Sequence, residues 1–385
     1  MQLPIFTKTE IERRQSVLRA KLAGLDAGVL ISFTNSYYMS GVPILPWGRP
    51  TITIIPMNDD PVIIAGKADE QNISLNSPIK NVITYGDIEG PNVNEAISHL
   101  ANELKRLGLS KIGVDGYYIL MAYVELLREK YPDCQIDDIT DSIEDMRLIN
   151  SDEEVDIIRI ATEIADYGMQ TYLSEAKLGM TEIEMAGRII LAMAKFAASK
   201  YPDMGITFNC YSQQGIHSLE PHAAASGQPL KPERLLCVVV EAAAEHYMAA
   251  VERAIALGDL LPEQQKYYDT VISALQKTIS ICAPGVLCST LDKASQAVFQ
   301  NAGYENFLCG TGLSRGLLNA FEGRLDKSNL RIYNDYPLKP NMVLSLEPYA
   351  IAPGVGAQRH CEMIRITENG NEVLSKAPSG YLRIA

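Results

Sequence analysis

The chain has 385 residues, which is more than one compact domain usually holds and suits two domains. Its 34 basic and 47 acidic side chains give a net charge of −13, which disfavours nucleic acid and anionic membrane surfaces as partners. Hydrophobic residues make up 47% of the chain and charged residues 21%, values that exclude a disordered chain and allow a sizeable core.

The first 148 residues alternate between helical and extended patterns and predict a small α/β domain. The turn signal Asn58-Asp59-Asp60 separates two β-branched runs and predicts a hairpin. The expected elements, in chain order, are a helix at 10–25, a strand at 27–33, the hairpin strands at 51–56 and 61–65, a helix at 92–108, a strand at 111–114 and a helix at 117–131.

A second domain is expected over residues 149–385. Ser151 and Glu154 form a capping box in front of an amphipathic helix, and Thr181 with Glu184 opens a second helix in the same way. Strands follow from about residue 205, interrupted by helices at 262–283 and 289–302, and strands are expected again at 343–346 and 361–366.

The chain shows no membrane segment and no secretory signal. No apolar run approaches the roughly 20 residues of a membrane span, and residues 1–8 lack a basic region followed by an apolar stretch. The seven cysteines are odd in number and include no Cys-x-x-Cys pair, so we interpret them as buried, reduced thiols. Together these features predict a cytoplasmic protein.

Four acidic residues lie on separate predicted strands of the second domain. Glu241 and Glu252 follow apolar runs on two neighbouring strands, and Glu347 ends a third run. Glu362 shares one face of the last strand with His360. A carboxylate at the end of an apolar run is costly unless it is paired. One such acid could simply face the solvent, but four on separate strands favour a common site.

His222 is the candidate for proton transfer. It lies in a loop after Pro221, and only an imidazole changes its charge easily near neutral pH. Taken alone, a loop histidine is more often a surface residue than a base. The chain has no phosphate-binding glycine loop, no His-Glu-x-x-His motif and no Gly-x-Ser-x-Gly elbow that would indicate another chemistry.

The order of these residues resembles the pita-bread family, which includes methionine aminopeptidases, proline-specific aminopeptidases, prolidase and creatinase. This resemblance implies an α/β (α+β) protein, in which a small N-terminal α/β domain precedes a curved antiparallel sheet covered by helices. It runs from about residue 10 to 380 and rests on Met146-Arg147-Leu148-Ile149 with Ser151, on His222, on Glu241 with Glu252, on Glu347-Pro348 and on Glu362.

Within the family, the creatinase branch is the most similar in its motifs. Asn35-Ser36-Tyr37-Tyr38-Met39-Ser40-Gly41 and Trp47-Gly48-Arg49 resemble creatinase segments in the first domain. Further similar segments are Gly215-Ile216 before His222, Ala250-Val251-Glu252-Arg253, Gly323-Arg324, and Arg359-His360-Cys361-Glu362.

The resemblance implies a role for each matching residue. His222 would move the proton, Glu252 and Glu347 would hold a cationic group, and His360 would be a second histidine in the pocket. Arg49 and Arg324 would bind a carboxylate, because the guanidinium fork donates two parallel hydrogen bonds. The remaining substrate-binding positions are the aromatic wall Trp47 together with Thr311, Glu241 and Glu362.

The implied function is a metal-independent hydrolase for a C–N bond of a small guanidino or amidino carboxylic acid, creatine or a relative. The substrate would be zwitterionic, and the resemblance implies a homodimer with the site near the subunit interface. A second possibility is an ectoine-type cyclic amidine hydrolase or a catalytically degenerate binding protein.

Two positions depart from the family pattern. Thr311 stands where creatinase and the metallopeptidases have a histidine, and Glu241 stands where they have asparagine or aspartate. Glutamates at 241 and 252 in place of the two aspartate ligands move the oxygens by more than a metal site tolerates, so no metal is expected. The alternative is an Xaa-Pro aminopeptidase or dipeptidase that depends on manganese or another divalent metal.

Overall fold

The structure is a computed structural model that describes residues 5–46, 48–86, 92–317 and 326–385. The described residues form two compact units. The first holds the residues up to Arg147 together with Leu317, and the second begins at Leu148. Each unit combines helices with β-sheet, which confirms the expected α/β class.

The first unit is built on a mixed sheet with the strand order β4-β3-β2-β1-β5-β6. The predicted hairpin is confirmed, since β2 and β3 pair antiparallel. The strand expected at 27–33 stops at Leu30, because the Ser32 hydroxyl accepts a hydrogen bond from the Asn35 amide and caps a helix that the sequence patterns did not predict. The strands are β1 Ala27–Leu30, β2 Ile52–Pro56, β3 Val62–Gly66, β4 Asn81–Tyr85, β5 Lys111–Val114 and β6 Gln135–Asp138.

Helices flank this sheet in the first unit, and the apolar side of α4 packs on its buried strands. The helices of this unit are α1 Lys8–Lys21, α2 Phe33–Ser40, α3 Glu70–Asn76, α4 Asn92–Arg106, α5 Met121–Lys130 and α6 Thr140–Arg147, with the short 3-10 helix η1 Lys67–Asp69.

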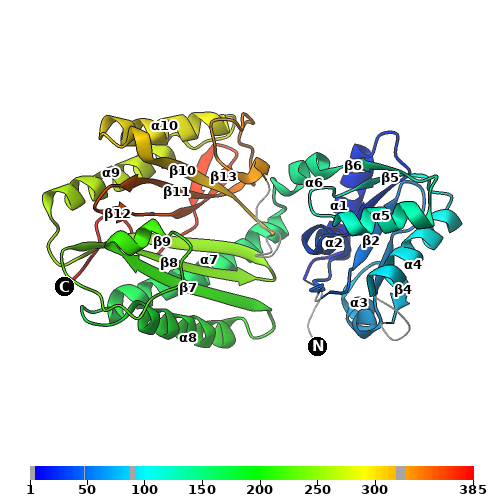
Figure 1. Cartoon of the computed structure of the whole chain (residues 1–385), viewed down its shortest axis with the longest axis horizontal. Helices are drawn as coiled ribbons and strands as arrows, with labels where there is room; N and C mark the ends of the chain where they lie inside the picture. The colour runs from blue at the N-terminus through cyan, green and yellow to red at the C-terminus, as the bar shows by residue number, and fades with distance from the viewer. Residues whose placement is uncertain (1–4, 47, 87–91, 318–325) are drawn as a thin grey trace. The chain divides into compact units, whose positions relative to one another are not determined.

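The second unit contains two sheets, ordered β15-β9-β8-β7 and β10-β11-β13-β14, with β12 paired to β11. Long helices cover each sheet: α7 and α8 pack on the first, and α9 and α10 on the second (Figure 1). The strands are β7 Ile206–Gln214, β8 Arg234–Ala244, β9 Tyr247–Leu257, β10 Leu308–Arg315, β11 Val343–Ala352, β12 Gly356–Ala357, β13 Glu362–Thr367, β14 Gly370–Val373 and β15 Arg383–Ile384.

The sequence signals at the helix ends of this unit act as expected. The capping box of Ser151 and Glu154 is present in full at the start of α7, and Thr181 accepts a hydrogen bond from the Glu184 amide at the start of α8. The helices are α7 Asp152–Glu175, α8 Glu182–Lys200, α9 Pro262–Ile281 and α10 Cys288–Asn301, with the 3-10 helices η2 Gly215–Leu219, η3 Glu305–Phe307 and η4 Asp326–Ser328. In the described parts of the chain, no helix is both long and apolar enough for a transmembrane span.

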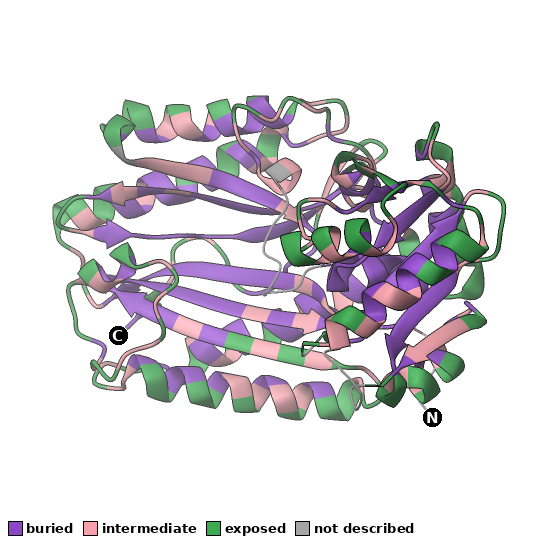
Figure 2. Cartoon of the chain, turned by 45° about the vertical axis from the view of Figure 1, so that its right-hand side comes forward, coloured by how far each residue is buried: buried purple, intermediate pink, exposed green. Residues whose placement is uncertain are grey.

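The hairpin of β8 and β9 forms the middle of the second unit, and both strands are buried over nearly their whole length (Figure 2). Glu245 and His246 make its two-residue turn with φ angles of 46° and 66°, which match the left-handed backbone that a tight hairpin needs. The two sheets meet where the Cys361 amide donates a hydrogen bond to the Glu252 carbonyl oxygen, 2.9 Å away. This junction positions the acidic residues.

Candidate active site

A pocket of about 380 Å³ lies in the second unit beside the β7–β8–β9 sheet. Its walls include three of the residues that the sequence analysis singled out, His222, Glu241 and Glu252, together with Arg359. The alanines at 223–225 line it as well, and their small side chains leave room for a ligand.

Glu241 and Glu252 reach this pocket because of the register of the β8–β9 hairpin. Glu241 pairs with Ala250, and Glu252 pairs with Val239, so the two acids lie on one face of the sheet. Glu241 is half-buried and accepts a hydrogen bond from the Asn209 side chain at 2.9 Å. Glu252 is 2% exposed. The pocket therefore has one accessible acid and one deeply buried acid.

Arg359 is the counter-ion of Glu252. Its Nε lies 3.3 Å from Glu252 Oε2, and its Nη2 donates to the Tyr211 hydroxyl at 3.1 Å and to the Pro221 carbonyl at 3.2 Å. Burial raises the pKa of Glu252 to about 7, the Arg359 charge opposes this rise, and the nearby Glu347 charge adds to it. Glu252 thus titrates near neutral pH although it faces an arginine.

Glu347 also has an arginine partner. Arg315 Nη2 lies 3.7 Å from Glu347 Oε2, and the Ser345 hydroxyl donates to the same oxygen at 3.1 Å. Glu347 is 7% exposed and Arg315 is 3% exposed, so this is a buried contact. The Cys361 thiol lies 3.0 Å from the Ser345 hydroxyl and thereby adjoins this acid.

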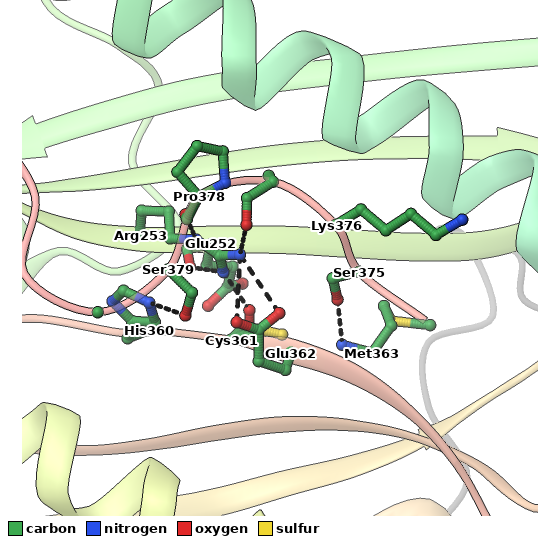
Figure 3. Close-up of polar contacts among 12 residues, drawn as sticks. Glu252, Arg253, His360, Cys361, Glu362, Met363, Ser375, Lys376, Pro378 and Ser379 are labelled. Atoms are coloured by element: carbon green, nitrogen blue, oxygen red, sulfur yellow. Dashed lines mark hydrogen bonds and ion pairs between the residues drawn. The ribbon is translucent and has the colours of Figure 1, made fainter. Parts of the chain in front are cut away.

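His360 and Glu362 are not among the residues that line the pocket, and they contact Ser379 and Arg253 (Figure 3). Arg253 Nη2 lies 3.3 Å from each Glu362 oxygen, and His360 Nε2 lies 3.1 Å from the Ser379 hydroxyl. Burial lowers the pKa of His360 well below its usual value, so its ring stays neutral. Because side chains alternate along an extended chain, Cys361 is the residue of this segment that faces Glu252 and Glu347.

Thr311 is fully buried and makes its hydrogen bond toward a helix. Its hydroxyl donates to Asp292 Oδ1 on α10 at 2.6 Å, and Gln296 donates to the other oxygen of Asp292. Thr311 is not among the residues that line the 380 Å³ pocket.

The two arginines proposed as carboxylate ligands are not among the described residues that line this pocket. Arg49 lies in the first unit. There, burial raises the pKa of Asp69, and the charge of Arg49 counteracts this rise. Trp47 and Arg324 lie outside the described residues. The structure thus brings His222, Glu241 and Glu252 to one pocket, with Glu347 near Glu252, and it places Thr311, His360 and Glu362 in other contacts.

The sequence analysis did not predict the arginines that pair with these acids. Arg253, Arg315 and Arg359 are all nearly or fully buried, and each contacts one acid of the set. A signal was available, because buried carboxylates need buried cations. Which arginine serves which acid depends on the sheet pairing.

Comparison with known protein families gives two matches that together cover most of the chain. Residues 156–368, more than half of the chain, match the model of "Metallopeptidase family M24", and residues 13–149 match "Creatinase/Prolidase N-terminal domain". The creatinase of a Bacillus species is 25% identical over 98% of this chain and 93% of its own length. The Xaa-Pro dipeptidase of Pyrococcus horikoshii is 28% identical over 91% of this chain and 93% of its own length.

Solved structures share the fold over nearly the whole chain. An Xaa-Pro dipeptidase from Bacillus anthracis superimposes with a TM-score of 0.83 at 22% identity, covering 97% of this chain and all of that one. The prolidase from Pyrococcus horikoshii OT3 gives a TM-score of 0.82 at 23% identity, covering 96% of this chain and 99% of that one. At these identities the similarity establishes the fold alone.

A metal centre of the kind that the matched family name implies does not fit these side chains. Glu252 and Glu347 each face an arginine within 4 Å, and a guanidinium at that distance competes with a divalent cation for the same oxygens. Thr311 replaces a nitrogen ligand and is already bound to Asp292. In the parts of the chain that the structure describes, no three His, Cys, Asp or Glu side chains are grouped to hold a metal ion.

Proposed function

The chain belongs to metallopeptidase family M24, and we propose that within this family it is a hydrolase that cleaves a C–N bond of a small cationic acid without a metal ion. The observation that carries the proposal is the pairing of the buried acids with arginines, above all Glu252 with Arg359. A metal-dependent relative needs its carboxylates for the metal. Here, guanidinium groups already face three of the acids, Glu252, Glu347 and Glu362.

His222 acts as the base in this proposal. It takes a proton from water while the water oxygen bonds to the amidino carbon, and it returns the proton to the leaving nitrogen when the C–N bond breaks. Glu241 is the pocket acid with no ion-pair partner among the described residues, so it holds the positive end of the substrate. The charge of this half-buried carboxylate favours a guanidino or amidino group.

Arg49 and Arg324 are proposed to bind the carboxylate of the substrate, as the creatinase motifs imply. A substrate with a carboxylate at one end and a guanidino or amidino group at the other would satisfy both kinds of residue. Creatine has this form, and so do its shorter and longer relatives.

A second candidate is a metal-dependent Xaa-Pro dipeptidase, and the names of the similar proteins favour it. One of the two relatives reported above and both solved structures are dipeptidases or prolidases by name. Hydrolysis of an Xaa-Pro bond also breaks a C–N bond, so the two candidates share the reaction type. They differ in substrate and in the need for a metal.

One experiment separates the two candidates. The purified chain is dialysed against EDTA, its metal content is measured, and its turnover is assayed on creatine and other guanidino acids and on Xaa-Pro dipeptides, with and without added MnCl₂. The first candidate predicts turnover of a guanidino or amidino acid that EDTA leaves unchanged. Dipeptide cleavage that EDTA abolishes and manganese restores would support the second candidate and reject the first.

A further inference from the structure

The imidazole of His222 has no hydrogen bond or ion pair with any residue that the structure describes, and its side chain is exposed. Its place at the pocket therefore depends on the backbone that carries it. That backbone is a tight turn, because the Ala223 amide donates to the Glu220 carbonyl at 2.9 Å. Pro221 occupies the second position of this turn, where its fixed φ is favourable, and His222 follows at the third position.

A single side chain holds both ends of this turn. The Gln213 amide nitrogen, Nε2, lies 2.7 Å from the Glu220 carbonyl oxygen and 2.8 Å from the Ala223 carbonyl oxygen. An amide NH₂ group has two hydrogens, so it can donate to both carbonyls at once. Gln213 is 1% exposed and lies near the end of β7, which fixes its own position.

We infer that Gln213 is a positioning residue that presents His222 to the pocket, an inference that rests on the proposed role of His222 as the base. Gln213 donates to the carbonyls on both sides of His222, those of Glu220 and Ala223. Gln213 itself is not among the residues that line the pocket. It is not a catalytic residue, because it acts only through the turn. Its effect should fall on the rate of the chemical step more than on substrate affinity.

The other hydrogen bonds of this loop hold its two ends and one carbonyl of the turn. Glu182, which is fully buried at the start of α8, anchors the two ends of the longer loop: its carboxylate accepts from the Gln214 amide and from the Ser226 amide, each at 3.0 Å. Arg359 adds one hydrogen bond to the Pro221 carbonyl at 3.2 Å. The loop ends are therefore held independently, and replacing Gln213 should loosen the turn without releasing the loop.

The test replaces Gln213 by methionine, which keeps the volume and removes both donors. Asn371→Leu is the matched control, because the Asn371 amide also donates to two main-chain carbonyls, those of Ile279 and Cys282, at 3.1 and 2.8 Å. If Gln213→Met fails to fold, Gln213→Asn, which keeps the amide on a shorter side chain, takes its place. Two quantities are measured, namely amide hydrogen exchange of residues 215–226 and steady-state kinetics on the guanidino acid that the wild type turns over.

The expected result for Gln213→Met is faster exchange in residues 215–226 by about tenfold or more. Its kcat should fall by about a hundredfold, while KM changes by less than about threefold. Asn371→Leu should leave both the exchange of this segment and kcat unchanged. Unchanged exchange in Gln213→Met, or faster exchange with an unchanged kcat, would overturn the inference. If the wild type turns over no guanidino or amidino acid, the proposed function fails, and the exchange result still decides whether Gln213 holds the turn.

Discussion

The Glu252 carboxylate and the Arg359 guanidinium form a buried ion pair, with Nε and Oε2 3.3 Å apart. Glu252 lies on β9, and Arg359 lies in the segment just before β13, close to Cys361, whose amide donates to the Glu252 carbonyl. Arg359 also binds the Pro221 carbonyl, so one side chain connects the buried acid with the turn that carries His222. Because an arginine faces the Glu252 carboxylate, this site differs from a metal centre, in which the carboxylates face the metal ion.

The pH dependence of stability should reveal the raised pKa of Glu252. Between pH 4.5, the ordinary pKa of a glutamate, and about pH 7, the folded chain keeps a proton on Glu252 that the unfolded chain has released. This group therefore favours folding below pH 4.5, and its contribution falls as the pH rises to 7, by about 3 kcal/mol in total. Glu252→Gln does not titrate and should lack this fall.

Urea unfolding of the wild type and of Glu252→Gln at about pH 5 and about pH 8 measures the difference in the free energy of unfolding. The wild type should lose more stability than the variant between the two conditions. Equal losses would mean that the pKa of Glu252 is not raised in the folded chain.

Arg359→Met should destabilise the chain and allow Glu252 to bind a metal ion. Removing one partner of a buried ion pair costs about 3–5 kcal/mol, because the other charge is left buried and alone. Without the Arg359 guanidinium, no cation competes with a divalent ion for the oxygens of Glu252. Added MnCl₂ should therefore raise the melting temperature of Arg359→Met and leave that of the wild type unchanged.

The control for this variant is Arg159→Met. Arg159 forms an ion pair with Glu372 in which both side chains are more than a third exposed, so its loss should cost no more than about 1 kcal/mol and create no response to manganese. A manganese response of the wild type as large as that of Arg359→Met would contradict the idea that the arginine keeps metal out.

His222→Gln should reduce turnover by about 10²- to 10⁴-fold, the usual contribution of a general base. Because the side chain is exposed, the free energy of unfolding should change by less than about 0.5 kcal/mol. His99→Gln, on α4 of the first unit, is the control and should keep full activity. Rate assays and urea unfolding on the three proteins test this, and an active His222→Gln would remove the base from the mechanism.

Thr311→Val tests the assignment of Thr311 to a structural contact. The variant removes the hydroxyl that donates to Asp292 and leaves a buried carboxylate with one donor fewer, so it should cost about 1–3 kcal/mol. Thr278→Val is the matched control, because the buried Thr278 hydroxyl donates only to the Ala274 carbonyl within its own helix. Thermal unfolding measures both. Equal losses of stability would show that the hydrogen bond to Asp292 stabilises the fold no more than the one within the helix does.

Local signals in the sequence determined much of the second unit and the hairpin of the first. The Ser151–Glu154 capping box marked the start of α7, because a cap needs only residues three apart. The Asn58-Asp59-Asp60 turn marked the hairpin of β2 and β3 for the same reason. The caps of α2 are local as well, yet the apolar run before Ser32 was interpreted as one longer strand.

The sequence also identified the residues with a potential chemical role: acids at the ends of apolar strands, which are costly to bury unless paired, and a histidine after a proline. Their partners were decided by the tertiary structure alone. Arg359 reaches Glu252 and Arg253 reaches Glu362 only because the segment around Cys361 meets β9 in one register. Gln213 reaches the His222 turn only because the loop after η2 folds back onto the end of β7. A shift of one residue would turn Cys361 away from Glu252 and bring its neighbours in, since side chains alternate between faces along a strand. Composition and spacing do not predict this register, because it depends on how segments that are distant in the sequence pack together.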